Sequence, residues 1–133
     1  MRQESLNFLH VRIEPPLEEF IVVVQHRPDV ARRLESALGH AGATVFTANT
    51  AVETVEVMNR YQAHLVVVDT HDGEGVFNEH VVFAAFHRGS GRICYSETFP
   101  EDGLMTWARW VDIRESVAAV VEQAIEWRRR MKE

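Results

Sequence analysis

The chain has 133 residues, of which 46% are apolar and 26% are charged, a composition typical of one globular domain. Twenty acidic and fourteen basic residues give a formal net charge of -6, which argues against a protein built mainly to bind nucleic acid. No apolar run reaches the length of a membrane span, and no apolar signal segment follows the first residues. The single cysteine, Cys94, excludes an internal disulfide and a cysteine-based zinc cluster, and predicts a cytoplasmic protein.

Five short apolar segments predict strands. Residues 20–24 are apolar without interruption and rich in β-branched side chains, as is typical of a strand buried on both faces of a parallel sheet. The expected strands are residues 20–24, 43–48, 65–69, 92–96 and 107–111.

The segments between these strands carry helix signals. Thr50 with Glu53, and Asp112 with Glu115, form capping-box patterns that precede apolar stripes. The expected helices are residues 28–41, 50–61, 76–87 and 112–132. The third of them is open to a strand alternative, because Val and Phe favour sheets. Before the fifth strand, a proline and a glycine leave room for only about one helical turn, near residues 101–105.

Regular alternation of strand and helix predicts the fold class. We expect an α/β, doubly wound, five-stranded parallel sheet, a flavodoxin-like three-layer sandwich with a shortened fourth helix. Residues 20–133 form this domain. Residues 1–19 are expected to be an N-terminal arm, an extra edge strand or a loosely packed terminus.

Ligands of such sheets bind at the carboxyl ends of the strands, which directs attention to the residues found there. The segments Val22–Pro28, Leu65–Asp69 and Ile93–Ser96 resemble the receiver domains of two-component response regulators, over about residues 20–127. The resemblance implies that Asp69 stands at the phosphoacceptor position and that Ser96 stands where a hydroxyl contacts the phosphoryl group.

Other positions depart from the receiver pattern. Gln25 and His26 stand where that family has the acidic pair that holds Mg²⁺, although Mg²⁺ prefers carboxylate ligands. Asp112 stands where the family has a lysine, and we expect it to cap the last helix, although Arg114 is close enough to reach the site.

Phosphoryl transfer depends on neutralisation of charge by a metal and a cation. We therefore expect a pseudo-receiver without catalytic residues or cofactor, with Mg²⁺ binding doubtful, in which Asp69 bonds loop amides or pairs with His26. In such a pair His26 is protonated more readily. One alternative is an atypical stand-alone response regulator phosphorylated on Asp69. Another is a small α/β enzyme or ligand-binding domain that uses the crevice near Gln25, His26, Asp69 and Ser96, although no glycine-rich phosphate loop is present.

Histidine and cysteine side chains suggest less. His71, Asp72, His80 and His87 lie near one another, but their spacing lacks the four-residue separation typical of metal ligands on a helix, so we expect no metal site. Cys94 lies inside an apolar strand and is expected to belong to the core.

Aromatic residues near the shortened helix suggest a contact surface. Tyr95, Met105, Trp107 and Trp110 form a candidate interface for a protein partner or a homodimer, since receivers commonly pair on that side. The alternative is that both tryptophans fill the volume vacated by the helix. The basic residues 128–132 are expected to be a solvated helix end. The expected function is thus signalling through protein contact.

Overall fold

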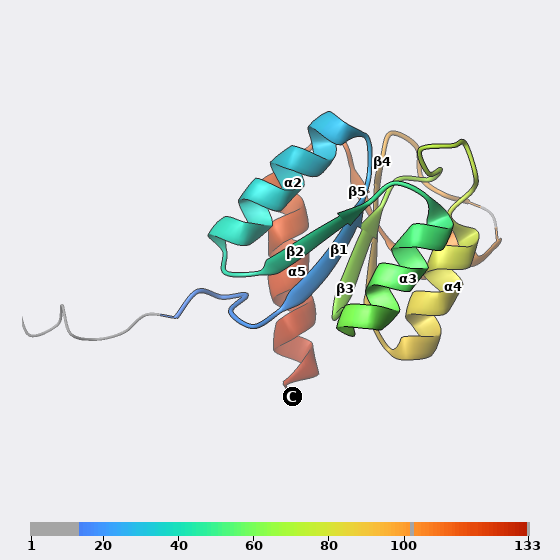
Figure 1. The fold of residues 1–133 in the computed structure, drawn as a ribbon. Helices are drawn as coiled ribbons and strands as arrows, with labels where there is room; N and C mark the ends of the chain where they lie inside the picture. Colours follow the sequence, from blue (N-terminus) through green and yellow to red (C-terminus); the bar gives the residue numbers. More distant parts are fainter. Residues whose placement is uncertain (1–13, 102, 133) are drawn as a thin grey trace, which may run out of the picture.

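The computed structural model describes residues 14–101 and 103–132. It contains a parallel sheet of five strands in the order β2-β1-β3-β4-β5 (Figure 1). The strands are β1 (Ile21–Gln25), β2 (Thr44–Ala48), β3 (Leu65–Val68), β4 (Gly91–Ser96) and β5 (Arg109–Asp112). This strand order is that of flavodoxin-like doubly wound sheets, in which the order reverses next to β1.

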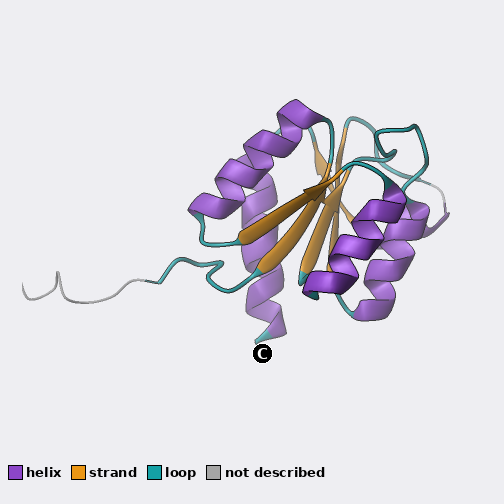
Figure 2. Cartoon of the chain, viewed as in Figure 1, coloured by secondary structure: helices purple, strands orange, loops and turns teal. Residues whose placement is uncertain are grey.

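Helices cover both faces of the sheet and give three layers (Figure 2). The helices are α2 (Pro28–His40), α3 (Ala51–Tyr61), α4 (Glu79–Arg88) and α5 (Val117–Met131). A 3₁₀ helix, η2 (Gly103–Trp107), occupies the connection between β4 and β5. The expected fold class and the shortened fourth helix are therefore confirmed.

The sheet separates two apolar cores. On one face, α2 and α5 pack through side chains such as Leu34 and Val120 against Val22, Val24 and Val67. On the other face, α3, α4 and η2 pack against the alternate strand residues, among them Val23, Val66 and Cys94. Because both faces are covered, β1, β3 and β4 are apolar on both sides, as a central parallel strand requires.

Local signals set several element ends as expected. The Thr50 hydroxyl accepts a hydrogen bond from the Glu53 N–H (3.1 Å), which confirms Thr50 as the N-cap, but the Glu53 carboxylate accepts the N–H of Asn49 (2.6 Å) in place of that of Thr50, so the capping box is confirmed only in its first half. Gly42 follows α2 with φ of +105°, a conformation that favours glycine. Residues 79–88 form a helix, so the strand alternative for this segment is wrong.

Two boundaries differ from the prediction. The fifth strand begins at Arg109, because the buried Met105 draws residues 103–107 onto the second core as η2. The last helix begins at Val117 with Ser116 as its N-cap, so the prediction that Asp112 caps it is wrong. Asp112 remains in β5 beside Ser96, and the turn that follows it delays the helix.

The segment before β1 is described from residue 14. Leu17 is completely buried in the first core, and its N–H donates to the Ala41 carbonyl. The residues that suggested an extra edge strand, 8–13, lie outside the described residues. In residues 14–101 and 103–132, no helix is long and apolar enough to cross a membrane.

Candidate functional site

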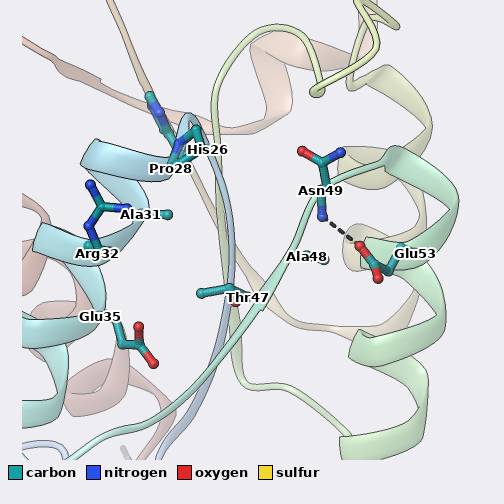
Figure 3. Close-up of a pocket in the computed structure, with 9 residues that line it drawn as sticks. All are labelled: His26, Pro28, Ala31, Arg32, Glu35, Thr47, Ala48, Asn49 and Glu53. Atoms are coloured by element: carbon teal, nitrogen blue, oxygen red, sulfur yellow. Dashed lines mark hydrogen bonds between the residues drawn. The ribbon is translucent and has the colours of Figure 1, made fainter.

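A polar crevice lies at the carboxyl ends of the strands. One part, of about 470 Å³, is lined by residues that include His26, Asn49 and Asp69. A second part, of about 410 Å³, lies between α2, β2 and the start of α3 (Figure 3). His26 and Asn49 line both parts, so the crevice brings the ends of β1, β2 and β3 together.

Asp69 directly follows β3 and lines this crevice. One carboxylate oxygen accepts the N–H of Thr70 at 2.7 Å, and the side chain keeps a quarter of its surface exposed. Its other oxygen lies 3.9 Å from Nε2 of His26. The structure thus brings Asp69 next to His26 and bonds it to a loop amide.

Gln25 belongs to a buried hydrogen-bond network and not to the crevice lining. Its carboxamide exchanges two hydrogen bonds of 2.8 Å with the carboxamide of Asn78, and its Nε2 also donates to the Thr54 hydroxyl at 3.2 Å. Asn78 further donates to the Asp69 carbonyl at 2.8 Å. All three side chains are buried, so the amide oxygen of Gln25 is already used inside the protein.

His26 has both ring nitrogens engaged. Nδ1 accepts the N–H of Arg27 at 3.0 Å, so Nε2 carries the proton that bonds the Tyr95 carbonyl at 2.7 Å. Burial lowers the pKa of His26 below its usual value and outweighs the Tyr95 carbonyl and the Asp69 carboxylate, which raise it. The prediction that His26 is protonated more readily is therefore wrong: it is a buried, neutral link between β1 and β4.

Ser96 ends β4 with its hydroxyl fully occupied. It donates to the Thr98 carbonyl at 2.8 Å and accepts from the indole Nε1 of Trp110 at 3.2 Å and the Cys94 thiol at 3.4 Å. The side chain is buried. In this arrangement the hydroxyl fixes the loop after β4.

Asp112 stands at the end of β5 and binds Arg114. The guanidinium donates to both carboxylate oxygens, and one of them also accepts the Arg114 N–H at 2.9 Å. These bonds to Arg114 lower the pKa of Asp112. Arg114 is therefore held by Asp112 at the exposed end of β5.

The residues present do not fit a Mg²⁺ ion of the receiver type. Gln25 spends its carbonyl oxygen on Asn78, and the ring nitrogens of His26 are engaged with main-chain atoms. Mg²⁺ prefers several hard oxygen ligands, whereas Asp69 is the one carboxylate among Gln25, His26 and Asp69.

The remaining candidate residues have structural surroundings. Asp72 accepts three backbone N–H groups at 2.8 Å. Although burial raises its pKa, these bonds, with that of Ala51 foremost, outweigh it and lower the pKa. Within residues 14–101 and 103–132, no three His, Cys, Asp or Glu side chains are placed to hold a metal. Burial raises the pKa of the Cys94 thiol to about 11, which keeps it protonated.

The four candidate interface residues do not form one exposed patch. Tyr95 and Met105 are buried, and the Tyr95 hydroxyl donates to the Glu115 carbonyl. Trp110 is half-buried over Ser96, whereas Trp107, outside the strand, is 43% exposed. Trp107 is thus the exposed tryptophan of the candidate interface, whereas Tyr95 and Met105 fill the two cores and do not line a surface.

Sequence reasoning missed Asn78 and Thr54. Asn78 precedes α4 and therefore has the appearance of an ordinary N-cap, yet its side chain makes no capping bond. Thr54 lies one turn into α3, and its hydroxyl also donates to the Thr50 carbonyl at 2.7 Å. A buried amide at position 25, at the end of an apolar strand, was the signal that such partners must exist.

The comparisons with known proteins concern the fold. No family model and no curated protein matches the chain. Among solved structures, the signal receiver domain of an HD domain-containing protein from Pseudomonas fluorescens Pf-5 is similar with a TM-score of 0.69 and 15% identity, over 87% of this chain and 93% of that one. The N-terminal domain of a response regulator/sensory box/GGDEF protein from Carboxydothermus hydrogenoformans gives 0.68 and 18%, over 86% and 100%.

A response regulator receiver domain from Methylobacillus flagellatus gives a TM-score of 0.66 and 11% identity, over 81% of this chain and 98% of that one. Identities this low show the fold alone. The chain thus has the fold of a receiver domain.

Proposed function

We propose that this chain is a receiver-like signalling domain that acts through protein–protein contact, without catalysis and without Mg²⁺-dependent phosphorylation of Asp69. The supporting observation is the reciprocal hydrogen bonding of Gln25 with Asn78. Gln25 stands where receiver domains have a metal-binding acid, and here its side chain holds β1 against α3 and the segment before α4. A phosphoryl group at Asp69 would therefore meet neither metal nor lysine to neutralise its charge.

The single cysteine supports a cytoplasmic location for such a domain. Cys94 is buried and protonated within β4, as a structural thiol in a reducing compartment would be. A buried thiol without a neighbouring base also argues against cysteine catalysis.

The phosphorylation part of the proposal is tested with beryllofluoride, which mimics a phosphoryl group on a carboxylate. The intact protein is titrated with beryllofluoride and Mg²⁺ while amide ¹H–¹⁵N spectra and tryptophan emission are recorded. We expect no saturable change at residues 69–72. A conventional receiver domain treated in parallel shows that the reagent is active.

Asp69→Ala and Asp29→Ala are the matched variants for this experiment. Asp29 is an exposed carboxylate at the start of α2, near the same end of the sheet. A saturable response of the natural chain that is lost in Asp69→Ala and kept in Asp29→Ala would overturn the proposal and establish an atypical phosphorylated receiver.

A further inference from the structure

A second hollow lies far along the sheet from the crevice, where β4 and β5 begin. We call it the Arg–Trp groove and define it by Arg92, Trp107, Arg109, Trp127 and Arg130. Its open part has a volume of about 370 Å³, and a small extension of about 30 Å³ reaches toward Leu65 and Gly91. The two parts share Arg92, Arg109, Trp127 and Arg130, so they are one feature.

Three guanidinium groups line this groove without an acidic partner. Among residues 14–101 and 103–132, no carboxylate lies within 4.0 Å of Arg92, Arg109 or Arg130. Elsewhere on the surface, Arg33, Arg114 and Arg129 each pair with an acid. Arginines without an ion pair also occur elsewhere among the described residues, for example Arg32 and Arg60, but here three of them line one hollow in a chain of net charge -6.

Arg92 is held in place by main-chain acceptors. Its Nε donates to the Trp107 carbonyl at 3.1 Å and its NH1 to the Ser90 carbonyl at 2.7 Å, and the guanidinium lies 5.2 Å from the centre of the Phe86 ring. Arg92 is half-buried, and this burial lowers its pKa. Arg92 therefore adds a fixed positive charge beside the exposed Arg109 and Arg130.

Aromatic surface lies beside the charges. The Trp107 ring packs 4.7 Å from that of Phe86, and 43% of Trp107 and 48% of Phe86 remain exposed. Arg130 lies 5.7 Å from the centre of the Trp127 ring. The Trp127 indole N–H is buried without a partner among the described residues. Exposed aromatic rings next to arginines are typical of the side chains that dominate protein interfaces.

We infer that the Arg–Trp groove binds a short acidic segment of a partner protein, whose carboxylates meet Arg109 and Arg130 and whose aromatic or aliphatic side chain packs on Trp107. This inference rests on the proposed function only in assuming that the chain acts through protein contact. Charge complementarity decides the choice of occupant. Duplex nucleic acid carries one charge per about 1.7 Å and needs a longer basic track than three arginines on an acidic protein.

The experiment is a selection from a displayed library of random 12-residue peptides on the intact protein, without counter-selection. We expect the captured peptides to be enriched in Asp and Glu around one aromatic or aliphatic residue. The affinity of the most enriched peptide, carrying a fluorophore, is then measured by anisotropy. Substitution of both exposed arginines should weaken binding about tenfold or more, and added salt should weaken it further.

Arg33→Gln/Arg60→Gln, at exposed positions on α2 and α3, is the matched control and should bind as the natural chain does. Enrichment without acidic residues, or equal binding to the Arg109→Gln/Arg130→Gln variant, would overturn the inference. Tighter binding of a single-stranded 12-nucleotide oligothymidylate than of the selected peptide would also overturn it. The same holds if the chain self-associates through the groove and no peptide binds there. Because the beryllofluoride titration reads the opposite end of the sheet, either proposal can fail while the other stands.

Discussion

The two ends of the sheet treat their polar groups in opposite ways. At the carboxyl ends of the strands, Gln25, His26 and Ser96 each have partners for the polar atoms of their side chains. At the amino ends of β4 and β5, Arg109 lines an open groove without a carboxylate partner, and the indole N–H of Trp127 has no acceptor among the described residues. Among the described residues, three arginines without a carboxylate partner therefore lie together at the end of the sheet where ligands are not usually bound.

This difference separates a stabilising region from a region with unused binding capacity. A buried network that is fully satisfied holds one conformation, because any rearrangement leaves polar groups unpaired. Unpaired arginines and exposed aromatic rings contribute favourable free energy only when a binding partner contacts them. Substitutions at the strand ends should therefore reduce stability, whereas substitutions of the exposed arginines should change binding.

Asn78→Leu should have the largest effect on stability. The substitution leaves the side-chain oxygen of the buried Gln25 and the half-buried Asp69 carbonyl without their Asn78 donor, while Gln25 Nε2 keeps the Thr54 hydroxyl. We expect the free energy of unfolding in urea to fall by about 2–4 kcal/mol, since each unsatisfied buried group costs about 1–3 kcal/mol. Asn59→Leu, an exposed site on α3, should change it by about 0.5 kcal/mol or less.

The double variant Gln25→Leu/Asn78→Leu sharpens the same point. It removes both members of the amide pair, so its loss of unfolding free energy should be smaller than the sum of the two single losses. Additive losses, or a loss below about 1 kcal/mol for Asn78→Leu, would mean that the pair does not act as one unit.

Gly91→Ala should have the next largest effect, at the opposite end of the sheet. A Cβ at Gly91 would lie 2.9 Å from the Leu65 side chain and 2.9 Å from the Trp127 indole. We expect overpacking to cost about 1–3 kcal/mol of unfolding free energy and to shift the Trp127 emission. Gly39→Ala, within α2 and with nothing within 4 Å of the new Cβ, should instead stabilise by about 0.5–1 kcal/mol. Stabilisation of both variants would show that Trp127 moves freely.

His26→Leu should lower stability less and change its dependence on pH. Loss of the bonds to the Tyr95 carbonyl and the Arg27 N–H should cost about 1–2 kcal/mol near pH 7.5. Because burial lowers the pKa of folded His26, the unfolded chain takes up a proton first as the pH falls below about 6.5. The stabilising contribution of His26 is thus present above that pH and is lost below it.

Urea unfolding of both proteins between pH 5 and 8 measures this contribution. The difference between the natural chain and His26→Leu should shrink toward acid, whereas His40→Gln, an exposed site at the end of α2, is the control for removing a histidine. A difference that grows toward acid would restore the ion pair between His26 and Asp69 that the sequence suggested.

Much of the fold followed from local sequence. The uninterrupted apolar strands, the Thr50 N-cap and Gly42 act over a few residues, and these determine element type and order. The start of β5 was harder to predict, because it depends on a tertiary contact: the buried Met105 packs into the second core. Likewise, the local sequence predicts that Asp112 caps a helix, and only its pairing with Ser96 in the sheet shows otherwise.

The candidate site was predictable in position and only partly in chemistry. The strand ends placed Asp69 beside His26, but the sign of the His26 pKa shift depended on burial and on a carbonyl of β4, 69 residues away. Asn78 was not predictable, because its bond to Gln25 joins residues 53 positions apart. Hydrogen-bond partners between distant segments leave no periodic pattern in a sequence.

Ser96→Ala should have the smallest effect of the four and distinguishes an occupied hydroxyl from a free one. A hydroxyl kept free to contact a phosphoryl group makes no hydrogen bond within the unphosphorylated fold and adds nothing to its stability. The Ser96 hydroxyl instead bonds the Thr98 carbonyl and the Trp110 indole. The indole keeps a second acceptor, the Ser96 carbonyl at 3.3 Å, so the loss should be only about 0.5–1 kcal/mol. The Trp110 emission should shift at the same time.

Ser116→Ala is the control, since that exposed N-cap side chain makes no capping bond. Equal unfolding free energies of the two variants, with unchanged Trp110 emission, would show that the Ser96 hydroxyl is free in solution.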